Sequence, residues 1–380
     1  MAINEIRKKI RSDLEAPAEL RRFGSGWFSG VIALIAAIAG LFFVFCLRFP
    51  GVFTMPQVRA FYDKPVFRFG LHILLISAFS FSILSLILRK NKILGYAALI
   101  VTLVATLLGG SRVPPSGELT SGSMLGLDWF VLNIIFTGLL FIPIEKLFAK
   151  YPDQPVFRDD WREDLFYFFV SSLLVQVLTF LSLSPTTALV KHTHWTTLRS
   201  WVANQYLIVQ FFEIMFLTDL VQYWVHRLFH RIPFLWKFHA VHHSAQQMDW
   251  IAGARMHFIE IVILRGTTII PMYLLGFANP ALYAYVLLVY VHSTFVHANV
   301  GWNFDRVGKF MVTPRYHHWH HGIEKEAIDV NFSIHFPLID RVFGTYYLPP
   351  GQWPKGYGID GHPVPKSYVG QFMYPFTKGK

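Results

Sequence analysis

Histidines in this sequence recur at spacings that could hold metal ions. Residues three and four apart lie on one face of a helix, so each cluster can direct two or three imidazoles at a common point. Imidazole is a frequent protein ligand for iron, zinc and copper. The first cluster pairs a four-residue spacing with a His-x-x-His-His motif, and the second repeats that motif far downstream. The first cluster comprises His226, His230, His239, His242 and His243, and the second comprises His317, His320 and His321.

A further histidine pair, His292 and His297, lies near the end of an apolar run. Its five-residue spacing suits one helix face less well and requires a bend or bulge. With the two clusters, these imidazoles are too many for one ion, which rarely takes more than about six protein ligands, so we expect two metal ions. A structural zinc site prefers four ligands, often cysteines. An all-nitrogen site with open positions instead suits iron or copper and oxygen chemistry.

The composition is that of an integral membrane protein. Of the 380 residues, 53% are hydrophobic and 15% are charged, whereas soluble domains carry roughly a quarter of charged residues. Several apolar runs are long enough to cross a bilayer. The net charge of +11 lies in basic residues that flank these runs, which fits anionic lipid headgroups and argues against a nucleic-acid partner. Cys46 is the single cysteine, so the chain can form neither an internal disulfide nor a cysteine-based metal site.

The apolar runs predict an all-α integral membrane protein, a multi-span helical bundle with a histidine-rich cytoplasmic cap that holds a dimetal site. We expect a tight turn at 276–280 to join the last two spans as a helical hairpin. If the N-terminus is cytoplasmic, an even number of crossings brings all histidine clusters to the cytoplasmic face. The eight expected spans are 27–47, 69–88, 93–108, 127–147, 165–183, 206–225, 258–275 and 281–296.

The same pattern predicts four parts of the chain. They are a basic cytoplasmic or interfacial N-terminus at 1–26, a transmembrane section of about four spans at 27–150, a catalytic domain at 151–350 and a C-terminal tail at 351–380.

Polar residues beside the histidines are candidates to orient them. Asp219 and Tyr223 precede His226 by seven and three residues and share its helix stripe. Because a metal-ligating histidine usually donates its other N–H to a carboxylate or carbonyl, we expect Asp219 to support a ligand. An ion pair with Arg227 is the structural alternative for this acid. Further candidates for supporting or ligating roles are Asn331, Asp329, Asp340, Glu213, Glu260 and His257.

The order of these motifs resembles the fatty acid hydroxylase and sterol desaturase superfamily. The resemblance covers roughly residues 155–350 and rests on HRLFH, LWKFHAVHHS, HANV, TPRYHHWHHG and IDRVFGTYY. It implies a non-haem dimetal centre, with iron in the active form, that reduces O2 and attacks a C–H bond of a lipid. Hydroxylation and desaturation share this ligand set, and sterol, fatty acyl and alkyl ether lipids all fit it. The implied ligands are His226, His230, His239, His242, His243, His297, His317, His320 and His321, with His292 as a tenth candidate.

The chain contains no flavin or haem motif, so electrons for oxygen chemistry must come from outside. We expect a soluble cytochrome or ferredoxin to dock on the basic cytoplasmic face. A histidine-lined metal transporter is the main alternative, but its histidines should lie at mid-membrane depth in successive spans. A bis-histidine haem cytochrome would need only one histidine pair per haem. The absence of HExxH argues against a zinc metalloprotease.

Overall fold

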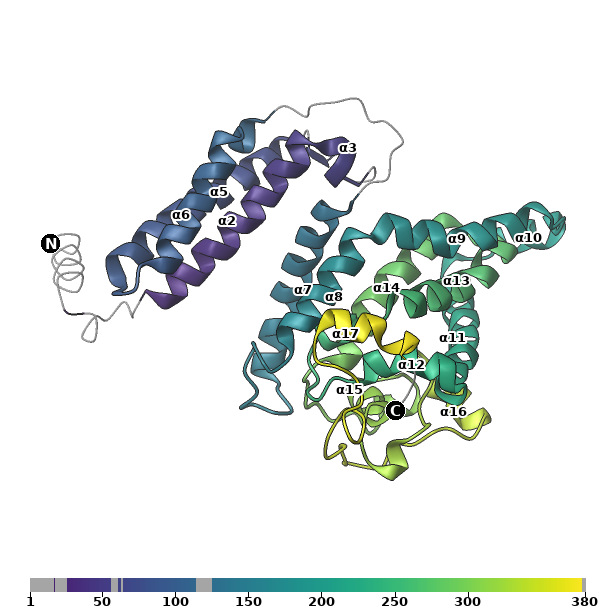
Figure 1. Ribbon diagram of the computed structural model, residues 1–380. Helices are drawn as coiled ribbons and strands as arrows, with labels where there is room; N and C mark the ends of the chain where they lie inside the picture. Colours follow the sequence, from purple (N-terminus) through teal and green to yellow (C-terminus); the bar gives the residue numbers. More distant parts are fainter. Residues whose placement is uncertain (1–16, 18–25, 56–60, 63, 114–124, 378–380) are drawn as a thin grey trace, which may run out of the picture. The chain divides into compact units, whose positions relative to one another are not determined.

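The computed structural model describes residue 17 and residues 26–55, 61–62, 64–113 and 125–377 (Figure 1). These residues form helices joined by loops, with no β-strand among them and a single isolated bridge between Gly322 and Tyr357. The prediction of an all-α fold is therefore confirmed. The chain divides into two compact units, residues 1–133 and 134–380. Most of the basic segment predicted at 1–26 lies outside the described residues.

The first unit is built on three apolar helices that pack against one another: α2 (Trp27–Arg48), α5 (Pro65–Leu88) and α6 (Ile93–Leu107). Small side chains line their contact, including Ala37, Ala78 and Ala98, all fully buried. Alanines at such positions let helix backbones approach closely, which is how apolar helices associate where lipid offers no hydrophobic drive. The short elements α3 (Pro50–Phe53) and η2 (Gly110–Arg112) lie at the ends of these helices.

The remaining helices carry the histidines, and α7 links the two units because it begins in the first and ends in the second. They are α7 (Leu127–Leu147), α8 (Trp161–Leu173), α9 (Val175–Lys191), α10 (Thr196–Ala203), α11 (Leu207–Arg231), α12 (Pro233–His243), α13 (Phe258–Leu275), α14 (Asn279–His297), α15 (Pro314–His320), α16 (Pro337–Val342) and α17 (Tyr368–Met373), with 3-10 turns η3 (Ala252–Ala254), η4 (Val307–Lys309), η5 (Lys325–Ala327) and η6 (Tyr374–Phe376).

Six helical segments among the described residues are long and apolar enough to cross a membrane, and they coincide with six of the expected spans. The span expected at 165–183 is instead divided between α8 and α9, which meet at an angle of 61°. The span expected at 281–296 forms α14, but its histidines and tyrosines make it less apolar than the others, and it is not among the six. The side of the membrane that carries the histidines therefore stays a prediction. The six are Trp27–Arg48, Pro65–Leu88, Ile93–Arg112, Leu127–Leu147, Leu207–Arg231 and Phe258–Leu275.

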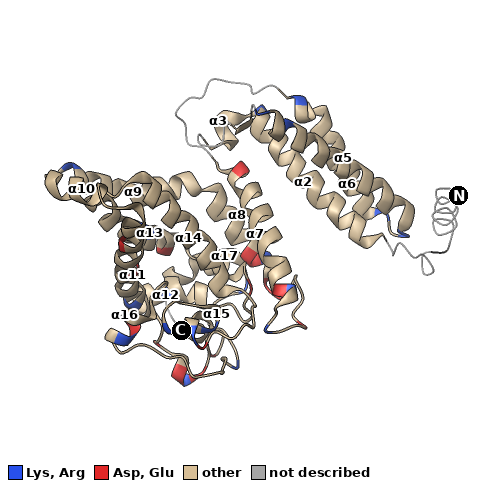
Figure 2. Ribbon diagram, turned by 180° about the vertical axis from the view of Figure 1, so that it is seen from behind, with Lys and Arg blue, Asp and Glu red and all other residues tan. Residues whose placement is uncertain are grey.

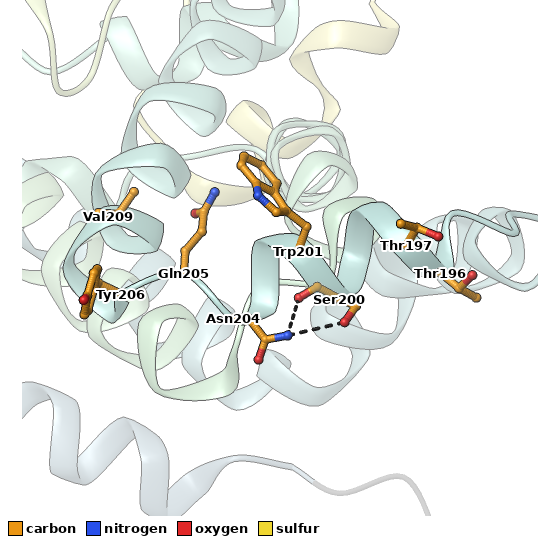
Figure 3. A pocket seen from close by; sticks show the side chains of 8 residues that line it. All are labelled: Thr196, Thr197, Ser200, Trp201, Asn204, Gln205, Tyr206 and Val209. Carbon is orange, nitrogen blue, oxygen red and sulfur yellow. Dashed lines mark hydrogen bonds between the residues drawn. The ribbon is translucent and has the colours of Figure 1, made fainter.

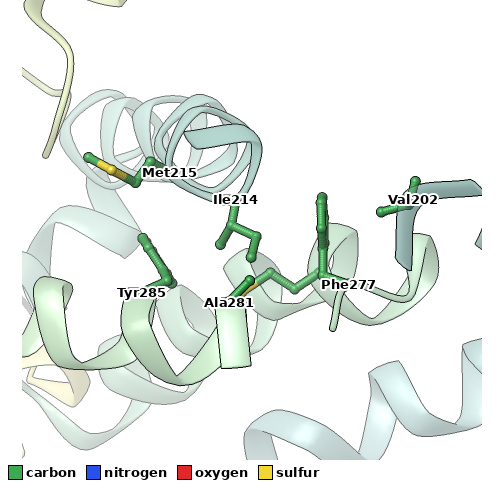
Figure 4. Close-up of a cluster of buried hydrophobic side chains, with 7 residues drawn as sticks. Val202, Ile214, Met215, Phe277, Ala281 and Tyr285 are labelled. Atoms are coloured by element: carbon green, nitrogen blue, oxygen red, sulfur yellow. The ribbon is translucent and has the colours of Figure 1, made fainter. Parts of the chain in front are cut away.

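Helix α11 is the centre of the second unit and packs against α12, α13, α14 and α16. Ile214 and Met215 of α11 lie in a buried apolar cluster with Tyr285 of α14 and Phe277 of the α13–α14 connection (Figure 4). Gly276 ends α13 with a φ of 73°, a left-handed conformation that glycine adopts without strain. The tight turn was predicted correctly, but the helical hairpin was wrong. Helices α13 and α14 each pack on α11 and on different second neighbours, α9 and α15, rather than along each other.

The charge distribution separates the apolar helices from the histidine-bearing cap. Lys, Arg, Asp and Glu lie mainly at the ends of the helices and in the connecting segments (Figure 2). Along α11, nineteen residue steps of about 1.5 Å place Leu207 and His226 about 29 Å apart. That distance is close to the thickness of a bilayer's hydrocarbon core, about 30 Å. The fold therefore brings the α11 histidines to one end of a helix long enough to cross the membrane.

Candidate metal centre

Nine histidines converge in two adjacent groups. Within each group, the ligand nitrogens all lie within 4.8 Å of one another. Helices α11, α12 and α15 supply the five-histidine group, and α12, α14 and α15, with the residue that follows it, supply the four-histidine group. The five-histidine group is His226, His230, His239, His243 and His320, and the four-histidine group is His242, His297, His317 and His321.

Each His-x-x-His-His motif is divided between the two groups. His239 and His243 enter the five-histidine group, whereas His242 enters the other. The second motif does the reverse: its first and last histidines enter the four-histidine group, and the middle one enters the five-histidine group. The cause is helix geometry, because positions i and i+4 lie close together on the helix face while i+3 lies on the other side of i. Sequence reasoning directed each motif at one point, and the structure directs each at two.

The spacing of the ring nitrogens suits metal coordination. In the five-histidine group, the Nε2 atom of His239 lies 2.9 Å from Nε2 of His226 and 3.1 Å from Nε2 of His243. In the four-histidine group, Nε2 of His297 lies 3.3 Å from Nε2 of His242 and 3.0 Å from Nε2 of His317. Metal–nitrogen bonds of about 2.1 Å, at angles of roughly 90° to 110°, place neighbouring ligand atoms about 3.0 to 3.4 Å apart. Three of the observed separations lie in this range, and the fourth, 2.9 Å, is just below it.

The outer ring nitrogens determine where the protons lie. The Nδ1 atoms of His242 and His297 donate to the carbonyl oxygens of Arg255 at 3.0 Å and Ser293 at 2.7 Å. A carbonyl oxygen only accepts, so each neutral ring holds its proton on Nδ1 and presents a bare lone pair at Nε2. The two lone pairs then face each other at 3.3 Å, where no hydrogen bond can form between neutral rings. A cation between them satisfies both nitrogens, so these residues fit a metal ion.

The five-histidine group has the same arrangement. His226 Nδ1 donates to the Phe332 carbonyl oxygen at 2.8 Å, and His320 Nδ1 donates to the Val330 carbonyl oxygen at 2.8 Å. His239 Nδ1 lies 2.5 Å from the Glu260 Oε1 atom. Backbone and carboxylate oxygens on the outer nitrogen are the usual way in which proteins orient metal-ligating imidazoles.

The buried imidazoles of α12 and α15 are held in their neutral form. Burial lowers their pKa values well below the usual range, and neighbouring imidazoles lower these pKa values further, because a positive charge there would be poorly solvated and repelled. Neutral imidazole is the form that ligates metals. The rings concerned are His239, His242, His243, His317, His320 and His321.

Among the described residues, the carboxylates that bond to a converging histidine do so in the five-histidine group. Glu260 in the first turn of α13 is fully buried and bonds to His239, as noted above. The partly exposed Asp329 places its Oδ1 atom 3.4 Å from Nδ1 of His230. The sequence offered both acids as minor candidates and favoured Asp219. One feature of the sequence pointed to Glu260: it is a carboxylate in the first turn of an apolar helix, and a carboxylate there needs a buried partner.

The predicted role of Asp219 is wrong. Its carboxylate accepts hydrogen bonds from the backbone N–H groups of residues 334–336, at 2.7, 3.1 and 2.6 Å, and bonds to no metal-ligand candidate. The alternative ion pair with Arg227 is not formed either, because that guanidinium donates to the Tyr223 hydroxyl at 2.9 Å. Tyr223 in turn contacts the hydroxyl of Thr345 at 3.0 Å. The face of α11 that carries Asp219 and Tyr223 packs against the loop that contains residues 334–336 and Thr345. Asp219 and Tyr223 therefore attach that loop to α11.

Asn331 also acts on the backbone around the last motif rather than on a histidine. Its side-chain amide donates to the carbonyl oxygens of Tyr316 and Tyr347 at 3.0 and 2.7 Å and accepts from the Tyr347 N–H at 2.8 Å. The neighbouring Asp340 accepts from the Phe332 N–H at 2.8 Å and from the Tyr316 hydroxyl at 2.9 Å. These bonds fix the carbonyl group of Phe332, which orients His226.

His292 lies outside both groups. Its Nε2 donates to the carbonyl oxygen of Val312 at 2.9 Å, and its ring centroid is 5.4 Å from that of His335. Five residues from His297, it projects from a different face of α14, so the structure does not support its predicted role as a ligand. His257 is also outside both groups and caps α13 by accepting from the Ile259 N–H.

Sequence reasoning missed a buried ion network behind the four-histidine group. Asp164 of α8 accepts from Arg158 and from Arg255 at 2.5 Å each, and Arg158 also bonds to Asp249 at 2.7 Å. Buried charges of this kind persist when each finds a partner. Because the Arg255 carbonyl orients His242, the network fixes a ligand's position. Nearby, a Cβ atom on Gly253 would lie 2.8 Å from Nδ1 of His297, so only glycine fits against this ring.

A surface hollow at the other end of α11 is unrelated to this centre. It lies between α10 and the start of α11 (Figure 3), and none of its eight lining residues is a histidine, cysteine or acid. The lining residues are Thr196, Thr197, Ser200, Trp201, Asn204, Gln205, Tyr206 and Val209.

Comparison with known proteins shows which family the segment around this centre is similar to. The family model described as Fatty acid hydroxylase matches residues 211–345, which include all nine converging histidines. Over these residues the chain is similar to the fatty acid hydroxylase superfamily. No solved structure matches the chain.

Curated relatives in this superfamily are lipid hydroxylases and monooxygenases. Ornithine lipid hydroxylase OlsE of Rhizobium tropici is 29% identical over 191 residues, 50% of this chain and 56% of that protein. Alkylglycerol monooxygenase of Homo sapiens is 27% identical over 130 residues, 34% of this chain and 28% of that protein. Methylsterol monooxygenase 1-2 of Arabidopsis thaliana is 25% identical over 146 residues, 37% and 47% of the two chains. The chain thus spans about half, or less, of the length of these relatives. The comparisons give the transporter alternative no support.

Proposed function

We propose that this protein is a membrane-bound oxidoreductase that uses O2, external electrons and two iron ions to oxidise a C–H bond of a membrane lipid. The observation that carries the proposal is the pair of converging imidazole groups, whose Nε2 lone pairs face one another at 2.9 to 3.3 Å. The relatives are named hydroxylases or monooxygenases, which favours hydroxylation over desaturation. Their names cover ornithine lipid, alkylglycerol and methylsterol, so the substrate class we propose is a membrane lipid with an accessible alkyl or sterol carbon.

The nine histidines of the two groups are the proposed metal ligands. When bound there, two iron ions supply the activation of O2 and the attack on the C–H bond. The chain's own residues hold several of the rings in place: carbonyl oxygens and Glu260 keep the protons of His226, His239, His242 and His297 on their outer nitrogens and direct the Nε2 lone pairs inward. Neutral ligands leave the positive charge of the ions uncompensated, which keeps them strong Lewis acids. His292 is not part of the proposed ligand set.

The position of the centre supports a lipid substrate. The histidines lie at the end of an apolar helix of bilayer length, so an alkyl chain can approach from the membrane without entering water. We further propose that this end faces the cytoplasm, where a soluble cytochrome or ferredoxin delivers electrons. The basic residues that flank the predicted spans suit an acidic donor.

Comparative lipid mass spectrometry of expressing cells tests the proposal. Cells with the intact chain should accumulate a lipid that has gained one oxygen atom, or lost two hydrogen atoms if the reaction is desaturation. His242→Ala and His320→Ala, one from each group, should abolish this product. His192→Ala is the matched control, because this exposed histidine at the end of α9 contacts neither group and should leave the product unchanged. An iron-loaded protein that modifies no lipid when supplied with electrons and O2 would contradict the proposal.

A further inference from the structure

Beyond the segment that matches the family, the C-terminal part of the described chain buries a polar side chain and exposes apolar ones. In α17, Gln371 is 1% exposed and faces the protein, whereas Val369 is 70% exposed and Met373 is 49% exposed. In η6, which follows directly, Phe376 is 54% exposed. A helix on a water-exposed surface shows the opposite pattern, with its apolar face against the core and its polar face outward. The medium outside α17 and η6 should therefore be apolar.

An unbroken row of aromatic rings joins this segment to the rest of the second unit. The row crosses α8, α17, the residue that caps α13, η6 and α12, with each ring centroid 4.5 to 6.3 Å from the next. Phe238 and His257 are buried, at 2% and 1% exposure, and connect the rings that reach the surface. Exposed aromatic side chains of this kind are typical of the zone where a membrane protein meets lipid headgroups. The members of this aromatic row, in order, are Phe166, Tyr368, Phe372, His257, Phe376, Phe238 and Phe234.

The aromatic row continues the apolar surface of a membrane-crossing helix. Leu228 and Ile232 at the end of α11 are exposed, and Phe234, the first ring on α12, is 60% exposed beside them in sequence. A contiguous exposed apolar surface of this kind marks contact with lipid or with a partner. Lys366 and Lys237 flank it, and Lys237 Nζ donates to the Thr377 carbonyl oxygen at 2.7 Å. Lysines beside an apolar surface are suited to lipid phosphates.

The same segment is attached to the metal centre through one histidine. His257 Nε2 donates to the Phe372 carbonyl oxygen at 3.0 Å, and its Nδ1 caps the first turn of α13. That turn carries Glu260, whose carboxylate bonds to His239. The aromatic row therefore lies one helical turn from a residue that holds a proposed metal ligand.

We propose that residues 367–377 and the exposed rings of the aromatic row lie in the headgroup zone of the leaflet next to the histidines and contact lipid. This surface sets the depth of the histidine groups relative to the membrane. The exposed apolar side chains of α17 and η6 favour lipid over a soluble protein partner. An electron donor binds only transiently, so Val369, Met373 and Phe376 would lie in water whenever the donor is not bound. The proposal does not depend on which reaction the centre performs.

Site-directed fluorescence in proteoliposomes tests this proposal on the full chain. Cys46 is the single cysteine and is buried, so a Cys46→Ala background gives a protein in which one introduced cysteine carries an environment-sensitive NBD label. Labels are placed at Phe376→Cys and Val369→Cys in the surface and at Asp360→Cys, an exposed tail residue outside it. The vesicles are phosphatidylcholine with or without lipids that carry a nitroxide quencher near the headgroup.

The proposal predicts blue-shifted emission at positions 369 and 376 and quenching by the nitroxide lipid at least about three times that at position 360. Labels at 369 and 376 that are quenched no more than the label at 360, and that remain accessible to a water-soluble quencher, would overturn it. Quenching that appears only after a soluble protein extract is added would also overturn it, in favour of a protein partner. Each labelled protein must keep the thermal midpoint of the background. The Val369→Cys variant keeps the test valid if Phe376→Cys fails to fold, since Val369 makes no contact in the aromatic row.

Discussion

Glu260→Gln separates the two proposed metal positions. Glu260 is fully buried, and its Oε1 atom lies 2.5 Å from Nδ1 of His239, so the carboxylate supplies a charge-assisted hydrogen bond to one ligand. The four-histidine group has carbonyl partners in the corresponding places. Replacing a residue that orients a metal ligand typically costs about 10- to 100-fold in metal affinity, which corresponds to about 1.4 to 2.7 kcal/mol. Glutamine keeps the oxygen acceptor and the shape but removes the charge.

The assay is iron content per chain after dialysis of the purified protein against chelators of increasing strength. The parent should keep iron in both groups to a higher chelator strength than Glu260→Gln, which should lose iron from the five-histidine group first and fall to about half of the parent's content. Glu213→Gln is the matched control, because this acid lies on α11 well before His226 and belongs to neither group. Equal loss from both groups, or loss equal to that of the control, would refute the reasoning that Glu260 acts through His239.

Three further results are expected. Asp219→Asn should lower the free energy of unfolding by about 2 to 4 kcal/mol, measured by thermal or denaturant unfolding in detergent, because a fully buried acceptor of three backbone N–H groups loses its charge; an unchanged stability would contradict the role assigned to it. Gly253→Val should remove iron mainly from the four-histidine group, since its Cβ would lie 2.8 Å from Nδ1 of His297, whereas Gly70→Val, at a position in α5 with open space around it and no positive φ, should keep both irons. In the metal-free protein, the lowered pKa values of the α12 and α15 imidazoles mean that the unfolded chain binds more protons below about pH 6.5. The thermal midpoint should therefore change little near pH 8 and fall increasingly as the pH is lowered from about 7 to 5.5, and a flat profile would contradict this.

The histidines that converge could be identified from the sequence, because the spacing within each motif follows the helical repeat and the family resemblance implied that the motifs meet. Nine of the ten candidates lie in the two groups. The sequence could not predict that each His-x-x-His-His motif is divided between the two groups, since that depends on how α11 and α14 are arranged around α12 and α15. His292 failed for a related reason: its place on α14 relative to His297 becomes clear only when the helix is seen to run unbroken to His297.

Residues that orient the histidines were harder to predict, because their partners are distant in sequence. Asp219 lies on the same face of α11 as His226, yet its carboxylate is occupied by hydrogen bonds from the loop at 334–336. Glu260 lies 21 residues beyond His239, and only the path of the chain between α12 and α13 brings them together. The bend between α8 and α9 also escaped prediction, since the run from Leu165 to Leu183 is mostly apolar and carries no glycine or proline at the break near Leu174.

X-ray absorption at the iron edge, combined with metal analysis of the purified protein, tests the central claim most directly. The account predicts about two iron ions per chain, each surrounded by nitrogen and oxygen atoms only, with the outer scattering pattern of several imidazoles. A sulfur ligand, a single ion per chain or an iron centre without imidazole scattering would contradict it.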